Sequence, residues 1–192
     1  MSRILQFTLV GIVFCCVLAT AQTPDSKNFS KDGLSFDYPA SWQVLDDSNS
    51  DLQQITLSKA DSDVKIGVFV HRGRTSPEKM ADAKKALVDP LIAGNAKQFA
   101  AMGAKTEQVP DSTEIAGLKA EGTSVNASFG GGDTGAAKIY WALVGQRFVV
   151  LSLFGPDKEI KQRAAVWDLV RTSLKVVDPK AAVPAASPKA SP

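Results

Sequence analysis

The side chains best suited to polar chemistry in this chain gather in one short segment. His71-Arg72-Gly73-Arg74 places two guanidinium groups and the single histidine within four positions. Such a group favours an anion or a carboxylate on a partner, because arginine binds carboxylates through paired hydrogen bonds. The same residues are also typical of a solvated loop between a strand and a helix. We therefore expect a solvated loop here, and we keep His71, Arg72 and Arg74 as candidate contacts for a partner or an anion.

A second segment is rich in glycine, Gly130-Gly131-Gly132-Asp133-Thr134-Gly135. Glycine-rich loops bind phosphate when they end in Gly-Lys-Ser/Thr and lead into a helix. This segment lacks that ending, and an apolar run typical of a strand follows it. It therefore predicts a hairpin loop, in which four residues form a flexible rim available to a partner: Gly130, Gly131, Gly132 and Asp133.

The sequence contains few residues in patterns typical of catalysis or metal binding. Cys15 and Cys16 both lie in a leader that we expect to be removed, so the mature chain has no thiol and a Cys/His metal cluster is excluded. A Ser-His-Asp triad would have to use His71, and no Gly-x-Ser-x-Gly motif accompanies it. The acidic stretch 46–51 lacks the ordered oxygen spacing and the glycine of a calcium loop. We predict no catalytic residue, no metal site and no cofactor.

The first residues predict export. Arg3 precedes an apolar run, Phe7 to Leu18, which is shorter than the ~20 residues that span a bilayer comfortably. Ala19-Thr20-Ala21 fits a cleavage pattern with the cut before Gln22, which predicts a periplasmic or secreted protein. An uncleaved anchor is the alternative. Lipid attachment to a cysteine fits poorly, because Phe14 stands where a small residue is needed.

Charge and length limit the class of protein further. The formal net charge is +2, and it falls to +1 once the single charge of the leader is removed. This balance argues against a nucleic-acid partner, which usually requires a basic excess. About 150 residues can fold as one domain without disulfides. We divide the chain into a signal peptide (1–21), a flexible lead-in (22–27), one domain without a transmembrane span (28–177) and a disordered Pro/Ala/Ser/Lys tail (178–192).

The elements that must position these groups can be predicted from hydrophobic patterning. In the segment 33–42, apolar side chains alternate up to Pro39, and Trp42 follows as a core residue. The runs 137–144 and 148–154 are almost wholly apolar, which predicts central strands covered on both faces. Gly145-Gln146 fits a two-residue hairpin turn between them. Other strands are predicted at 29–31, 54–58, 64–70, 105–115, 118–129 and 174–176, and helices at 76–102, interrupted at Asp89-Pro90, and from Pro156-Asp157 to 174.

The segment Gly33-Leu34-Ser35-Phe36-Asp37-Tyr38-Pro39-Ala40-Ser41-Trp42 resembles the opening of the PsbP-like family. A closing helix with Trp167, followed by Thr172-Ser173-Leu174-Lys175-Val176, is similar to the end of that family's domain. The resemblance covers about residues 28–177. It implies an α+β fold, in which an antiparallel β-sheet is flanked by helices on both faces as an α/β/α sandwich. The family includes lumenal subunits of photosystem II, a Ran-binding nuclear import factor and exported bacterial proteins, whose common theme is binding or assembly without catalysis.

We therefore expect an exported, non-enzymatic binding or assembly module that uses surface loops to engage a protein or a small ligand, with an envelope or extracellular protein as its partner. Two alternatives remain: an extracytoplasmic, hydrolase-like enzyme whose Ser, Asp or Glu groups the sequence does not identify, and a structural envelope component. A cleft with paired carboxylates would favour the enzyme. An apolar groove between sheet and helices would favour a ligand or peptide, and an exposed aromatic patch a protein partner.

Overall fold

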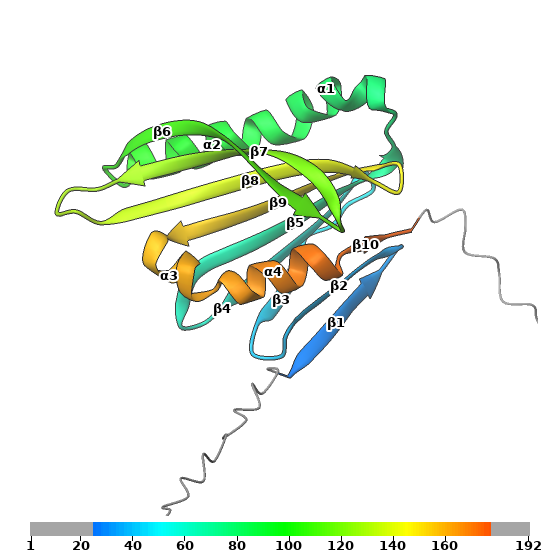
Figure 1. The fold of residues 1–192 in the computed structure, drawn as a ribbon, viewed down its shortest axis with the longest axis horizontal. Helices are drawn as coiled ribbons and strands as arrows, with labels where there is room; N and C mark the ends of the chain where they lie inside the picture. The colour runs from blue at the N-terminus through cyan, green and yellow to red at the C-terminus, as the bar shows by residue number, and fades with distance from the viewer. Residues whose placement is uncertain (1–24, 178–192) are drawn as a thin grey trace, which may run out of the picture.

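The computed structural model describes residues 25–177, which form a layered α+β domain (Figure 1). Its strands are β1 (Ser26–Lys31), β2 (Leu34–Pro39), β3 (Gln43–Asp46), β4 (Leu52–Lys59), β5 (Ser62–Arg74), β6 (Lys105–Ile115), β7 (Leu118–Ser128), β8 (Thr134–Val144), β9 (Arg147–Pro156) and β10 (Lys175–Val176). Its helical segments are η1 (Pro77–Lys79), α1 (Met80–Ala83), η2 (Lys84–Val88), α2 (Asp89–Ala101), α3 (Asp157–Gln162) and α4 (Ala164–Ser173). The predicted signal peptide and tail lie outside the described residues. Each helix described is too short or too polar to span a bilayer.

Two antiparallel sheets organise the strands. The large sheet has the order β3-β4-β5-β9-β8-β7-β6, and the small one β1-β2-β10. Within the described chain, β8 and β9 lie inside the large sheet, as their apolar runs predicted. Gly145 and Gln146 link them with φ values of +56° and +66°. Two successive positive φ angles suit the tight turn of a two-residue hairpin, so this prediction is confirmed.

Each face of the large sheet carries its own apolar core, and neighbouring residues of β8 contribute to different cores. Tyr140 joins the core under α3, α4 and the small sheet, together with Trp42 and Trp167. Trp141 joins the core under η2 and α2, together with Phe99. Figure 1 shows α1 and α2 along one side of the sheet and α3 and α4 on the other. The predicted antiparallel sheet with helices on both faces is therefore confirmed.

The first helical region changes its winding at the predicted interruption. A π-helical turn, η2, ends at Val88, and α2 begins with Asp89 and Pro90. Proline lacks the N–H that a helix interior requires, and wider turns of this kind are found where a helix must absorb such an irregularity. Gly103 follows α2 with φ +85°, a conformation typical of the glycine that ends a helix.

Several local predictions were wrong. The closing helix is divided at Arg163, whose φ of −102° and ψ of 12° are not helical. Ala164 is exposed at the start of the new helix, whereas Trp167 and Val170 are buried. In addition, the segment 43–46 forms β3, which pairs with β4, so the predicted acidic loop begins after Asp46 instead of at it.

Arg147, the first residue of β9, ties the small sheet to the large one. Its side chain is only 2% exposed. Its Nε donates to the His71 carbonyl at 2.9 Å, and its terminal nitrogens donate to the Gln53 side chain at 2.5 Å and to the Asp32 carbonyl at 3.4 Å. The Gln53 amide then donates to the Lys31 carbonyl at 2.9 Å. A guanidinium suits this position because it supplies several donors in one plane.

Candidate functional site

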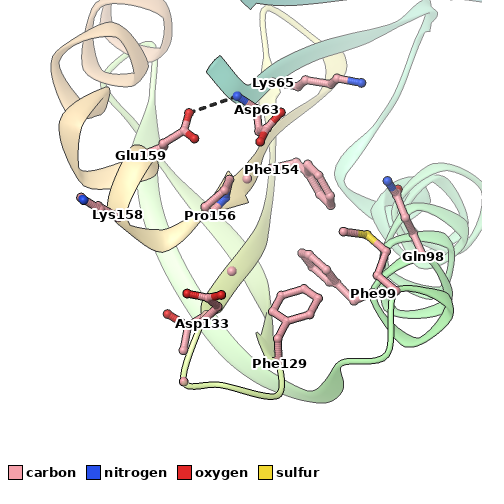
Figure 2. Close-up of a pocket in the computed structure, with 15 residues that line it drawn as sticks. Asp63, Lys65, Gln98, Phe99, Phe129, Asp133, Phe154, Pro156, Lys158 and Glu159 are labelled. Carbon is pink, nitrogen blue, oxygen red and sulfur yellow. Dashed lines mark hydrogen bonds between the residues drawn. The ribbon is translucent and has the colours of Figure 1, made fainter. Parts of the chain in front are cut away.

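An open cavity of about 800 Å³ lies where the end of α2 meets the ends of β5 and β9 and the loop between β7 and β8 (Figure 2). Three phenylalanines from three different segments form its floor. The Phe99 and Phe154 rings are stacked with centroids 5.0 Å apart, and Phe129 meets Phe99 edge-on at 6.2 Å. Both arrangements are favourable for aromatic rings. We call this cavity the phenylalanine pocket.

Local sequence explains how each ring reaches the pocket. Alternation along β9 places Phe154 on the face that α2 covers. Phe99 follows Ile92 by seven residues on α2, so both side chains point from one side of the helix into the core, and both are buried. Phe129 follows β7, and its N–H donates to the Asp133 carbonyl at 2.9 Å. This last bond closes the loop that forms one wall.

The glycine segment that sequence analysis singled out forms this wall. Gly132 and Asp133 line the phenylalanine pocket, whereas Gly130 and Gly131 belong to the same loop without lining it. Gly131 and Gly132 have φ values of +90° and +92°, a region open to glycine but strained for other residues. The turn therefore depends on glycine at both positions.

Gly135, at the start of β8, keeps the floor of the pocket open. A Cβ atom there would stand 3.1 Å from the Gly155 carbonyl and within 3.7 Å of the rings of Phe99 and Phe129. Any side chain at this position would therefore crowd β9 and extend over the aromatic floor.

Charged side chains surround the apolar floor. Glu159 at the start of α3 accepts hydrogen bonds from the Ser62 hydroxyl at 2.6 Å and from the Asp63 N–H at 3.0 Å. This pair of bonds fixes the β4–β5 turn against α3. Figure 2 shows the carboxylates of Asp63 and Asp133 on the side that faces the phenylalanines, whereas the ammonium groups of Lys65 and Lys158 point away.

The basic segment 71–74 forms the end of β5 and not the strand-to-helix loop that we predicted, because β5 extends through Arg74. Arg72 donates to the Asn49 carbonyl at 2.7 Å and to the Asp32 carboxylate at 2.9 Å. His71 Nδ1 lies 3.2 Å from the Gly73 carbonyl. The Arg72 side chain is thus paired with the turn between β1 and β2.

His71 and Arg74 line a second, smaller pocket of about 420 Å³, whose walls include Leu52, Ala86 and Leu87. Arg72 does not line it. The structure therefore brings two of the three predicted contacts together and directs the third to an intramolecular carboxylate.

Sequence analysis missed a polar cluster centred on Asp111 of β6. Its carboxylate accepts hydrogen bonds from the Tyr140 hydroxyl at 2.7 Å and the Ser124 hydroxyl at 2.8 Å. Partial burial acts to raise the pKa of Asp111, but these bonds and the Ser112 N–H outweigh it and lower that pKa. Burial, and next the bond to Asp111, raise the pKa of Tyr140. Only the register of three strands unites these residues, so no local motif signals the cluster.

The acidic groups do not suit a metal ion. Within residues 25–177, the structure contains no group of three or more His, Asp or Glu side chains arranged to hold one. Asp111 lines neither of the two pockets described above.

No protein-family model matches this chain, and neither does a curated protein. Solved structures do. Cyanobacterial PsbP (CyanoP) from Synechocystis sp. PCC 6803 is similar with a TM-score of 0.51 and 14% identity, over 82% of this chain and 95% of that one. The Ran-binding protein Mog1p of Saccharomyces cerevisiae has a TM-score of 0.47 and 13% identity, over 82% and 98%. LpqN, involved in cell envelope biogenesis of Mycobacterium tuberculosis, has a TM-score of 0.41 and 14% identity, over 80% and 91%.

The likeness to CyanoP extends over most of both chains and agrees with the two-sided antiparallel sheet described above. It also agrees with the pattern of residues 33–42, in which β2 ends at Pro39 and Trp42 enters the core. This chain therefore has the PsbP-like fold.

Proposed function

We propose that this domain is a non-catalytic binding module that holds a small ligand in the phenylalanine pocket. The observation that carries the proposal is an open cavity of about 800 Å³ with three aromatic rings as its floor and polar groups at its rim. Ligand sites commonly have volumes of roughly 300–1,000 Å³, an apolar lining and a few polar groups that fix orientation. A groove of this kind between sheet and helix favours binding over the two alternatives.

An enzyme is less well supported. Asp111, with its Tyr140 and Ser124 partners, is the described carboxylate that most resembles a catalytic group, but it lies outside both pockets. Its lowered pKa also makes it a weak base, because an efficient general base has a pKa near the working pH. These properties suit a structural hydrogen-bond network between β6, β7 and β8.

The place of action follows from the N-terminal pattern. Residues 1–21 have the charge, apolar run and small residues of a cleaved leader, and we propose that the domain works in the periplasm or outside the cell. An envelope or extracellular protein is then the partner that would deliver or receive the ligand. The glycine loop, with Gly132 and Asp133 on the pocket wall, is the segment we propose for that exchange.

The proposal is tested by titrating the protein with benzyl alcohol, a neutral phenyl compound, while its backbone amides are followed by NMR. We expect saturable shifts at Gly132, Gly135 and Gly155, and their loss in Phe129→Ala. Phe29→Ala is the matched control, because Phe29 is a partly buried phenylalanine of the small sheet that stacks on Phe36, away from the pocket. Saturable shifts confined to other parts of the domain would contradict the proposal, and so would a lack of shifts at the pocket amides with both this neutral probe and the charged phenyl probes described below.

A further inference from the structure

The rim of the phenylalanine pocket distributes its charges unequally. Three carboxylates and two ammonium groups line the cavity, namely Asp63, Asp133, Glu159, Lys65 and Lys158. Because the lysine side chains point outward while Asp63 and Asp133 face the phenylalanines, the charge directed into the cavity is negative. A ligand with a carboxylate or phosphate would meet these acids at close range and would be repelled.

The end of α2 adds to this polarity. The helix is 13 residues long and ends at Ala101 without a basic residue in its last turn. The C-terminal end of a helix carries a partial negative charge, and Met102, the residue that caps it, lines the pocket. No side chain of that last turn therefore offsets the negative end of the helix beside the cavity.

The aromatic floor favours the same sign of charge. The faces of phenylalanine rings are negative, so organic cations bind over them, most effectively when carboxylates stand nearby. A divalent metal would instead require several oxygens that converge on one point, and the carboxylates within residues 25–177 form no such group. An organic cation can interact favourably with the phenylalanine rings and with the carboxylates at the same time.

From these observations we infer that the ligand of the phenylalanine pocket is a small organic ammonium compound. Its apolar body lies against the half-buried rings of Phe129 and Phe154, with the buried Phe99 stacked on Phe154, and its cationic group faces Asp63 and Asp133. This inference rests on the proposed function and specifies its ligand.

The test compares three phenyl probes of similar size by NMR titration of the protein: benzyltrimethylammonium, benzyl alcohol and phenylacetate. We expect benzyltrimethylammonium to bind about five-fold more tightly than benzyl alcohol, and phenylacetate to bind least. Added sodium chloride should appreciably weaken the binding of the ammonium probe alone, since salt screens the attraction between its charge and the carboxylates. Magnesium chloride should produce no saturable shift at the pocket amides.

Variants localise the effect. Asp63→Asn and Asp133→Asn should each weaken benzyltrimethylammonium about two- to three-fold while leaving benzyl alcohol unchanged. Glu107→Gln is the matched control, because Glu107 is an exposed acid on β6 that does not line the pocket. Asp63 and Asp133 are themselves exposed, so Asp63→Asn and Asp133→Asn should preserve the fold.

Each outcome is decisive. If phenylacetate or benzyl alcohol binds as tightly as the ammonium probe, or if magnesium saturates the same amides, the inference is overturned although the pocket still binds ligands. If the three probes all fail to shift the pocket amides, the inference and the proposed function both fail.

Discussion

The guanidinium of Arg147 donates a 2.5 Å hydrogen bond to the side-chain oxygen of Gln53, and both residues are almost fully buried, at 2% and 1% exposure. Gln53 lies on β4 and Arg147 on β9, yet both also reach the backbone of the β1–β2 turn. This pair is therefore a buried polar connection between the two sheets, beside the more exposed Arg72–Asp32 and Lys31–Asp46 ion pairs. A buried cation is tolerated here because carbonyl and amide oxygens accept its hydrogen bonds.

Replacing Arg147 should destabilise the domain. Arg147→Met leaves the Gln53 oxygen and the His71 carbonyl without this donor, and we expect a loss of about 3 kcal/mol in the free energy of unfolding. Urea denaturation measures it. Arg171→Met is the control, since the Arg171–Asp168 pair lies at the surface and should contribute at most about 1 kcal/mol. Equal losses in the two variants would refute the role of Arg147.

The two core tryptophans should each carry several kcal/mol of stability. Trp42 and Trp167 are 4% and 8% exposed and belong to the same core. We expect Trp42→Ala and Trp167→Ala to cost about 3–5 kcal/mol each, because large cavities remain. Leu45→Ala, at a residue that is 57% exposed, should change the midpoint of unfolding little. Midpoints like that of the wild type in both tryptophan variants would disprove the core assignment.

The Asp111–Tyr140 bond should make stability depend on pH. Tyr140→Phe removes a donor, so the pKa of Asp111 should rise toward its ordinary value. A carboxylate whose pKa is lowered by folding stabilises the protein above the unfolded pKa of about 4 and loses that contribution as the pH falls. We therefore expect the variant to be about 1 kcal/mol less stable at pH 7, with a smaller difference at pH 3.

Urea denaturation at the two pH values, with an NMR titration of Asp111, checks this prediction. Ser124→Ala is a matched variant, since it removes the other side-chain donor to the same oxygen, and it should act in the same direction. A difference between wild type and Tyr140→Phe that grows as the pH falls would contradict the assigned sign.

Gly135→Val should close the phenylalanine pocket. Its side chain would occupy the space above Phe99 and Phe129, so benzyl alcohol should no longer shift the pocket amides. Gly94→Ala is the control on the same side of the sheet, because nothing lies within 4 Å of a Cβ at Gly94. That change should stabilise α2 by about 0.5–1 kcal/mol and preserve binding. Binding of benzyl alcohol to Gly135→Val with wild-type affinity would show that the probe occupies another site.

Patterns within one segment were enough to predict much of the architecture. The apolar runs that became β8 and β9 and the turn at Gly145-Gln146 were predictable because strand burial and left-handed φ angles depend on neighbouring residues. The division at Arg163 was not, since residues on both sides of it favour a helix. β3 was missed because four residues with one exposed leucine, Leu45, give no clear alternation.

The phenylalanine pocket could not be predicted from the sequence, for a different reason. Phe99, Phe129 and Phe154 come from a helix, a loop and a strand, and their rings meet because α2 packs on the sheet beside the β7–β8 loop. Arg147 is similar: an arginine beside a turn is usually solvated, and it is buried here because acceptors from two sheets converge on it. The glycine loop was the one part of the pocket with a local signal.

The small sheet also has a consequence for the order in which the domain folds. β10 pairs with β2, and the Ser173 hydroxyl accepts a hydrogen bond from the Asp37 N–H across 136 residues of sequence. Contacts this distant in sequence form late, because the intervening chain must first lose its conformational freedom. A chain emerging from its N-terminus would therefore hold β1 and β2 as an unfinished hairpin until its last strand arrived.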